Sequence, residues 1–126
     1  MYAIFYHQGQ CCEAGTRLFL PSTIHAEFTE KLVLKTKRLK LGDPRDLASD
    51  LGPLISRKQQ ERVLGYIQKG KQEGAVIATG GGIPRDPLLA KGFFVEPTVF
   101  TNVRNSMTIA QEEIFGPVLS ILRYDN

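Results

Sequence analysis

Apolar residues occur along the chain in two patterns: short continuous runs, and longer stretches in which they recur every three or four positions. The continuous runs are rich in β-branched and aromatic residues and have the length of buried strands. They lie at residues 17–20, 75–79, 93–100 and 118–124. Strands that alternate with amphipathic helices indicate an α/β fold with a mainly parallel sheet and flanking helices.

The first amphipathic stretch follows the first of these runs and predicts a helix. Ser22 or Thr23 can cap its first turn. Ile24, Phe28 and Leu32 then recur at intervals of four residues, which is the spacing of neighbours on one helix face. We expect this apolar face to pack against the sheet.

A second helix is predicted to begin at Ser56, because the Ser-x-x-Gln sequence that ends at Gln59 is a capping box. Val63, Tyr66 and Ile67 share one face of this helix, and a glycine a few residues later ends it. The irregular segment before Ser56 is long enough to be functional or to wrap another surface.

Both ends of the chain lie in apolar segments. The first residues, through Gln8, are rich in aromatic side chains and predict the last turns of a helix that Gly9 stops. The run at 118–124 has no capping element after it. Such ends are unlike the polar linkers that border domains, so we expect the surfaces that cover them to belong to sequence outside this chain.

Composition is that of a soluble globular protein. Hydrophobic residues make up 42% of the chain and charged residues 23%, which excludes disordered, collagenous and disulfide-scaffold proteins. At 126 residues the chain has room for one domain. No apolar run reaches the roughly 18 residues of a membrane helix, and no signal peptide opens the chain. We therefore expect a cytoplasmic protein without a membrane partner.

The net charge of +3 does not change this picture. Many of the basic residues fall in the first predicted helix and the segment after it, without interleaved aromatic residues or a nucleic-acid motif. A solvated helix face explains them, and we expect no nucleic-acid partner.

The chain has two cysteines, Cys11 and Cys12, and they are adjacent. Neighbouring residues rarely form a disulfide, because the bridge strains the peptide between them. His7 and His25 do not supply the spacing of a zinc site, so we expect no metal. Composition alone leaves two interpretations open, a pair of packed core thiols or one reactive thiol beside a filler residue.

The surrounding sequence favours the reactive thiol. A thiolate is the strongest nucleophile that proteins offer near neutral pH. Gly9 and Gly15 flank Cys12 on a predicted turn, which gives a carbonyl carbon room to approach the sulfur. The backbone N–H of Cys12 itself is available to stabilise an oxyanion.

Three motifs resemble those of the aldehyde dehydrogenase family. The segment from Phe5 to Cys12 resembles the active-site cysteine signature, in which Gly-Gln and one spacer precede the nucleophile. Gln111–Val118 resembles the family's Glu-Glu-x-Phe-Gly-Pro segment, and Gly92–Phe100 is similar to a strand common in these enzymes. Glu13 departs from the pattern, since a small or apolar residue usually stands there, and an acid opposes thiolate formation if it faces the sulfur.

The resemblance implies part of the family's catalytic domain and a two-stage reaction. Cys12 would attack an aldehyde to form a thiohemiacetal, hydride would pass to NAD or NADP, and water would release a carboxylic acid from the thioester. Glu113 would bind the nicotinamide ribose, and Phe115 would pack beside the nicotinamide ring. Gln59 and Arg62 stand where family members contact the adenosine ribose, although an ordinary polar helix face explains them equally well.

The resemblance covers residues 1–126 and implies a partial, cysteine-bearing catalytic domain. The family's general-base glutamate, oxyanion-hole asparagine and cofactor-binding domain precede the cysteine, and we expect these and the oligomerisation segment outside this chain. The expected partners are an aldehyde, the rest of the enzyme and further copies in a homo-oligomer. The alternative is a non-catalytic α/β fragment that keeps the motifs, with Glu112 and Glu113 as a solvated acidic pair. On either interpretation we expect no aldehyde oxidation by the isolated chain.

Overall fold

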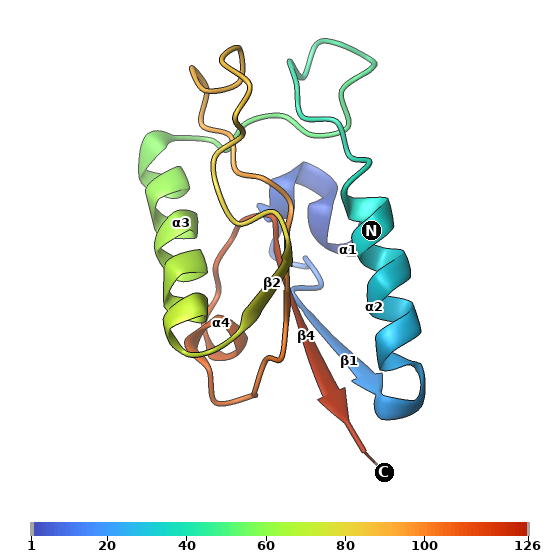
Figure 1. Ribbon diagram of the computed structural model, residues 1–126. Helices are drawn as coiled ribbons and strands as arrows, with labels where there is room; N and C mark the ends of the chain where they lie inside the picture. The colour runs from blue at the N-terminus through green and yellow to red at the C-terminus, as the bar shows by residue number, and fades with distance from the viewer. Residues whose placement is uncertain (1, 126) are drawn as a thin grey trace.

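A computed structural model of the protein describes residues 2–125 and has one four-stranded sheet between two layers of helices (Figure 1). The strands are β1 (Arg17–Pro21), β2 (Val76–Thr79), β3 (Thr98–Thr101) and β4 (Val118–Tyr124). Their order across the sheet is β1-β4-β3-β2. Strand β4 pairs in parallel with β1 and β3, whereas β2 is antiparallel to β3. The predicted α/β fold with a mainly parallel sheet is confirmed.

Strand β4 lies inside the sheet and is apolar on both faces. Val118 and Leu122 are buried toward one layer of helices, and Leu119 and Ile121 are buried toward the other. Ser120 is the polar residue within this run, and its hydroxyl donates to a backbone carbonyl at 3.4 Å. A parallel strand covered on both faces has a continuous apolar sequence, which is why its pattern predicts it correctly.

Helices cover both faces of the sheet. Helix α2 (Ser22–Thr36), α1 (Tyr2–Phe5) and the short 3-10 helix η1 (Tyr6–Gly9) lie on one side, and α3 (Arg57–Gln72) and α4 (Thr108–Gln111) lie on the other (Figure 1). Each side has its own apolar core. The core beneath α3 includes Val63, Ile67, Phe100, Ile109, Val118 and Leu122, and the core beneath α2 includes Phe5, Leu20, Leu32, Val99 and Ile121.

The apolar face predicted for α2 is wrong in the first half of the helix. Leu32 is buried, but Ile24 and Phe28 are 45% and 43% exposed. A strict four-residue spacing advances by about 40° per step on a helix of about 3.6 residues per turn. The three side chains therefore point in different directions, and the last of them faces the sheet.

Side-chain capping differs between the two long helices. The cap predicted for α2 at Ser22 or Thr23 is wrong, because Pro21 occupies the N-cap position and no side chain caps the first turn. The cap predicted for α3 is confirmed, since the Ser56 hydroxyl accepts from the N–H of Gln59 at 3.2 Å. The reciprocal half of a capping box is missing, because the Gln59 side chain points to another segment.

Two further elements differ from the sequence pattern. The apolar run at 93–100 forms a strand only from Thr98 onward, because Pro97 has no backbone N–H to contribute to a ladder. The pattern does not predict α4, since four residues are too few to display a helical period.

The N-terminal helix is shorter than predicted. Helix α1 ends at Phe5, and His7 and Gln8 within η1 have left-handed φ values of 49° and 58°. Gly9 follows with a φ of 70°, so the chain turns sharply before the cysteines. The predicted helix includes Met1, which lies outside the described residues.

Glu73 connects the end of α3 to the start of α4. Its carboxylate accepts from the backbone N–H of Thr108 at 2.8 Å and from the hydroxyl of Thr108 at 2.6 Å. The hydroxyl bond is the main cause that lowers the pKa of Glu73 from its usual 4.5, and Lys69 adds to the shift. Because the pKa is lower in the folded state, the stabilisation is present above the usual pKa and is lost as the pH falls through the lowered value.

We expect Glu73→Gln to lower the melting temperature at neutral pH, because an amide offers one acceptor oxygen in place of two. The difference from the unsubstituted chain should narrow as the pH falls below about 4.5, and thermal unfolding followed by circular dichroism measures it. Glu61→Gln, the same charge change at an exposed position of α3, is the control. A Glu73→Gln difference that is equally large at neutral and acidic pH contradicts the prediction.

Candidate active site

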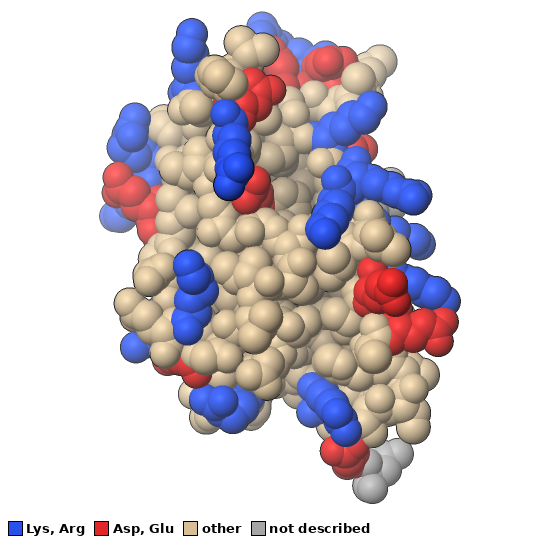
Figure 2. All heavy atoms as spheres, in the orientation of Figure 1, with Lys and Arg blue, Asp and Glu red and all other residues tan. Residues whose placement is uncertain are grey.

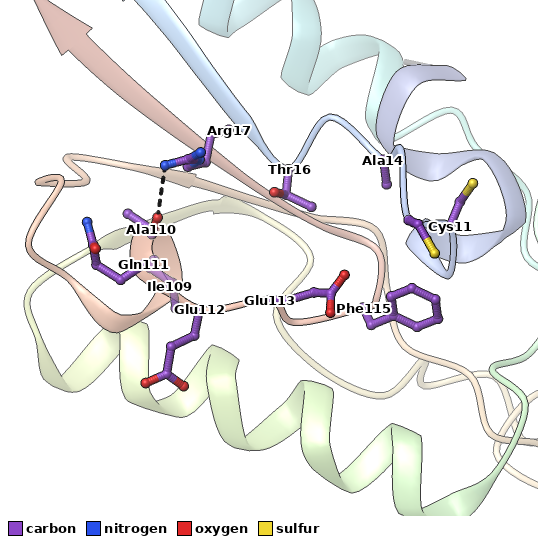
Figure 3. Close-up of a pocket in the computed structure, with 11 residues that line it drawn as sticks. Cys11, Ala14, Thr16, Arg17, Ile109, Ala110, Gln111, Glu112, Glu113 and Phe115 are labelled. Atoms are coloured by element: carbon purple, nitrogen blue, oxygen red, sulfur yellow. Dashed lines mark hydrogen bonds between the residues drawn. The ribbon is translucent and has the colours of Figure 1, made fainter.

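Two segments far apart in sequence meet at one end of the sheet. The loop with Cys11 and Cys12 leads into β1, and residues 112–117 lead into β4. Because β1 and β4 are parallel neighbours, the segments that enter them lie at the same end (Figure 3). They line an open cavity of about 230 Å³. The cavity lining includes Cys12, Arg17, Glu112, Glu113 and Phe115.

Two glycines allow this approach. A Cβ built on Gly9 would collide with the carbonyl group of Gly116 and would lie 3.1 Å from the nitrogen of Pro117. A Cβ on Gly116 would in turn collide with the side chain of Val63 on α3. The cysteine loop, the 112–117 segment and α3 are therefore stacked in direct contact, with no room for a side chain between them.

Cys12 is the more accessible of the two thiols. Its side chain is exposed, whereas that of Cys11 is half-buried, and both are free. The N–H of Ala14 donates to the carbonyl of Cys11 at 3.0 Å and closes a tight turn around Cys12. The interpretation of a packed core thiol is thus wrong for Cys12. Its role as a nucleophile stays a prediction.

The side chains of Glu112 and Glu113 point in different directions (Figure 3). The Glu112 carboxylate lies toward α3 and accepts from the hydroxyl of Tyr66 at 2.7 Å. That bond is the main cause that raises the pKa of Tyr66 above its usual value of 10.0. The Glu113 carboxylate points toward the cysteine loop, and within residues 2–125 it accepts no hydrogen bond. The Glu112 carboxylate is therefore hydrogen-bonded to α3, whereas the Glu113 carboxylate is free of hydrogen bonds within the described residues.

Phe115 lies beside the cysteine loop in an unusual backbone conformation. Its half-buried ring contributes to the cavity wall (Figure 3). Its φ is 61°, in the left-handed region that residues with a side chain rarely adopt. Strained conformations of this kind persist only where surrounding contacts determine them.

Gln59 and Arg62 of α3 contact the backbone of this segment. The side-chain nitrogen of Gln59 donates to the carbonyl of Phe115 at 2.7 Å, and Nη2 of Arg62 donates to the carbonyl of Glu113 at 2.6 Å. Both residues thus lie next to the predicted cofactor-binding residues. Their own contact with a cofactor stays a prediction.

Two residues belong to the site although the sequence does not single them out for it. Nη1 of Arg17 donates to the carbonyl of Ala110 at 3.5 Å and brings a positive charge to the cavity (Figure 3). Tyr66 packs against the core beneath α3, as its place on the apolar face predicts, and in addition donates its hydroxyl hydrogen to Glu112. A helical wheel shows that Tyr66 lies beside Arg62 but not that it reaches Glu112, and no sequence signal marks Arg17.

The rest of the described surface is mixed in charge. In Figure 2, basic side chains lie over several elements of the visible face, with acidic side chains among them. Among residues 2–125, no cluster of three or more His, Cys, Asp or Glu side chains could hold a metal ion. Within the same range, no helix has both the length and the apolar character needed to cross a membrane.

Comparison with known proteins identifies the family. A sequence model of the aldehyde dehydrogenase family matches residues 1–126. The chain belongs to the aldehyde dehydrogenase family. It is 49% identical over 126 residues to the betaine aldehyde dehydrogenase of Brucella anthropi and 52% identical to that of Brucella ovis. All of the chain is covered, against 26% of either relative.

Solved structures of aldehyde dehydrogenases contain the same fold. The betaine aldehyde dehydrogenase of Staphylococcus aureus, in complex with NAD+, matches 98% of the chain at 39% identity with a TM-score of 0.96. The NAD+ complex of the Bacillus cereus aldehyde dehydrogenase matches 99% at 46% identity with a TM-score of 0.93. The chain covers 25% of each, so it spans about a quarter of the length of the aldehyde dehydrogenases it matches.

We expect Gly9→Ala to lower the free energy of unfolding by about 2 kcal/mol or more, because a Cβ there meets both a left-handed φ and the carbonyl of Gly116. Urea denaturation measures the change. Gly65→Ala is the matched control, since its Cβ would point into open space on α3. In a helix that substitution stabilises by about 1 kcal/mol. Similar effects of the two substitutions would contradict the contact between Gly9 and Gly116.

We expect Glu112→Gln to move the pKa of Tyr66 down toward its usual 10.0, because the charged acceptor that favours the neutral phenol is removed. A pH titration of the tyrosine ring carbons by NMR resolves the residue. Glu113→Gln is the control and should leave the Tyr66 titration unchanged. If Glu113→Gln lowered the pKa of Tyr66 and Glu112→Gln did not, Glu113 would be the partner of Tyr66, which contradicts the geometry.

Proposed function

We propose that residues 1–126 are the cysteine-bearing part of a catalytic domain that oxidises an aldehyde to a carboxylic acid with NAD. One observation carries this proposal. The exposed thiol of Cys12, the free carboxylate of Glu113 and the ring of Phe115 line one cavity, although about a hundred residues separate them in sequence. The named relatives of this chain are betaine aldehyde dehydrogenases, which supports an aldehyde as the substrate.

The protein's part in the chemistry begins with Cys12. Its thiolate adds to the carbonyl carbon of the aldehyde, and the carbonyl oxygen becomes an oxyanion in a thiohemiacetal. The N–H of Cys12 donates to no group within residues 2–125, so it is available to that oxyanion. A bound nicotinamide would supply the hydride acceptor that turns the thiohemiacetal into a thioester. Water then hydrolyses the thioester, which releases the acid and returns the thiol.

The residues across the cavity suit a nicotinamide riboside. The Glu113 carboxylate has free acceptor oxygens for ribose hydroxyls, and a charged acceptor makes strong hydrogen bonds. The half-buried ring of Phe115 offers an apolar surface for the nicotinamide ring. Gln59 and Arg62 extend the same wall along α3, where the adenosine ribose is their proposed ligand. The related structures named above hold NAD+, which supports NAD over NADP as the cofactor.

The proposed partners follow from the share of the relatives that the chain covers. Because it covers 26% of the Brucella enzymes, the other catalytic groups and the cofactor-binding domain are proposed to come from the rest of a longer enzyme. That enzyme is proposed to be a cytoplasmic homo-oligomer. The alternative, a fragment that keeps the motifs without taking part in catalysis, makes the opposite prediction in the experiment below.

The experiment replaces the matching quarter of the Brucella ovis betaine aldehyde dehydrogenase with this chain. We expect the chimera to reduce NAD with betaine aldehyde, and Cys12→Ala to lower kcat/KM by roughly 10³-fold or more, because the nucleophile is lost. Formation of NADH, followed by absorbance, measures both.

Cys11→Ala is the matched control, since it removes the neighbouring thiol from the same loop and should keep most of the activity. A folded chimera whose activity is the same with and without the Cys12 thiol would refute the proposal. A folded chimera without activity in any variant would favour the non-catalytic alternative.

A further inference from the structure

Helix α3 presents three polar side chains to the 112–115 segment, one above another. Gln59, Arg62 and Tyr66 are three and four residues apart, so they share one face of the helix. Each donates at least one hydrogen bond to the segment, and Arg62 shares the carbonyl of Ile114 with Gln59, since Nε of Arg62 donates to it at 3.4 Å. The shortest bonds run from Tyr66 to the Glu112 carboxylate at 2.7 Å, from Arg62 to the Glu113 carbonyl at 2.6 Å, and from Gln59 to the Phe115 carbonyl at 2.7 Å.

Gln59 differs from the other two because it contacts both peptide groups that flank Phe115. Its side-chain nitrogen donates to the carbonyl of Ile114 at 3.2 Å and to the carbonyl of Phe115 at 2.7 Å. These two carbonyls belong to the peptide planes on either side of the Phe115 Cα. Holding both planes fixes the backbone rotation between them, which is the rotation that is left-handed in Phe115.

Gln59 is itself held in place on a rigid element. Its backbone N–H donates to the hydroxyl of Ser56 in the first turn of α3, and one helical turn later Val63 packs against Gly116. The donors of Gln59 are thus aimed at Phe115 by the helix rather than by a flexible loop. A positioning group on a regular element, locked by its neighbours, is what a precisely shaped site requires.

We propose that Gln59 is the positioning residue of this site. It holds Phe115 in its left-handed conformation and so fixes the orientation of the ring that would face the nicotinamide. The part of this inference that concerns nicotinamide rests on the proposed function. The side-chain nitrogen of Gln59 donates to both carbonyls, and its side-chain oxygen is left to accept from a ligand. Glutamate cannot replace Gln59, because a carboxylate has no hydrogen to donate and would face two carbonyl oxygens.

The experiment uses the isotope-labelled chain and NMR. The ¹³C chemical shifts of Phe115 report whether its φ is left-handed, and they should do so in the unsubstituted chain. We expect Gln59→Glu to abolish this signature, because the two carbonyl bonds are lost. Gln68→Glu is the matched control, since it makes the same change at an exposed position of α3 and should leave the Phe115 shifts unaltered.

Gln59→Leu is the second variant, because it removes the donors without adding a charge. A left-handed Phe115 in either variant, with the chain still folded, overturns the proposal. If neither variant folds, the unsubstituted chain decides: nuclear Overhauser effects between the Gln59 amide protons and the Phe115 α proton support the proposal, and their absence overturns it. These signals do not depend on Cys12, so a failure here is distinguishable from a failure of aldehyde oxidation in the chimera.

Discussion

The site depends on a contact between two backbones, that of Gly9 before the cysteines and that of Gly116 before β4. No side chain fits between them, since a Cβ on Gly9 would overlap the carbonyl of Gly116. The φ of 70° at Gly9 is also in the left-handed region. Glycine is the residue that accepts both conditions without strain. This contact brings Cys12 to the cavity wall that Glu113 and Phe115 form.

Helix α3 supports the contact from the opposite side. Val63 packs against Gly116, and the polar face of the helix binds the backbone and one side chain of residues 112–115. The segment itself has little regular structure, so its shape comes from the helix behind it. Helix α3 thus acts on the proposed cofactor side of the cavity mainly by binding the backbone of residues 112–115. Its effect on the side chains of Glu113 and Phe115 is indirect, through that backbone.

The sequence predicts those features that arise from local pattern. All four strands coincide with apolar runs, although β3 and β4 are mostly buried whereas β1 and β2, at the edges of the sheet, are mostly half-buried or exposed. Helix α3 is found because Ser56 caps it. The burial of Ile24 and Phe28 is predicted incorrectly, because a spacing of four residues drifts around a helix by about 40° per step. The divergence of the two glutamates is not predictable, since it depends on the hydroxyl of Tyr66, which only tertiary structure brings near. The same holds for the contact of Arg17 with the cavity.

Membership of the aldehyde dehydrogenase family explains why these features occur together, since about a quarter of each matched enzyme has this fold. The roles of individual residues rest on the contact between the two segments. The most direct measurement is a nuclear Overhauser experiment on the α protons of Gly9. The structure predicts cross-peaks to the δ protons of Pro117, whose nitrogen lies 3.1 Å from the position that a Cβ on Gly9 would occupy. Their absence in a chain that still shows the cross-strand signals of β1 and β4 would contradict the arrangement of the site.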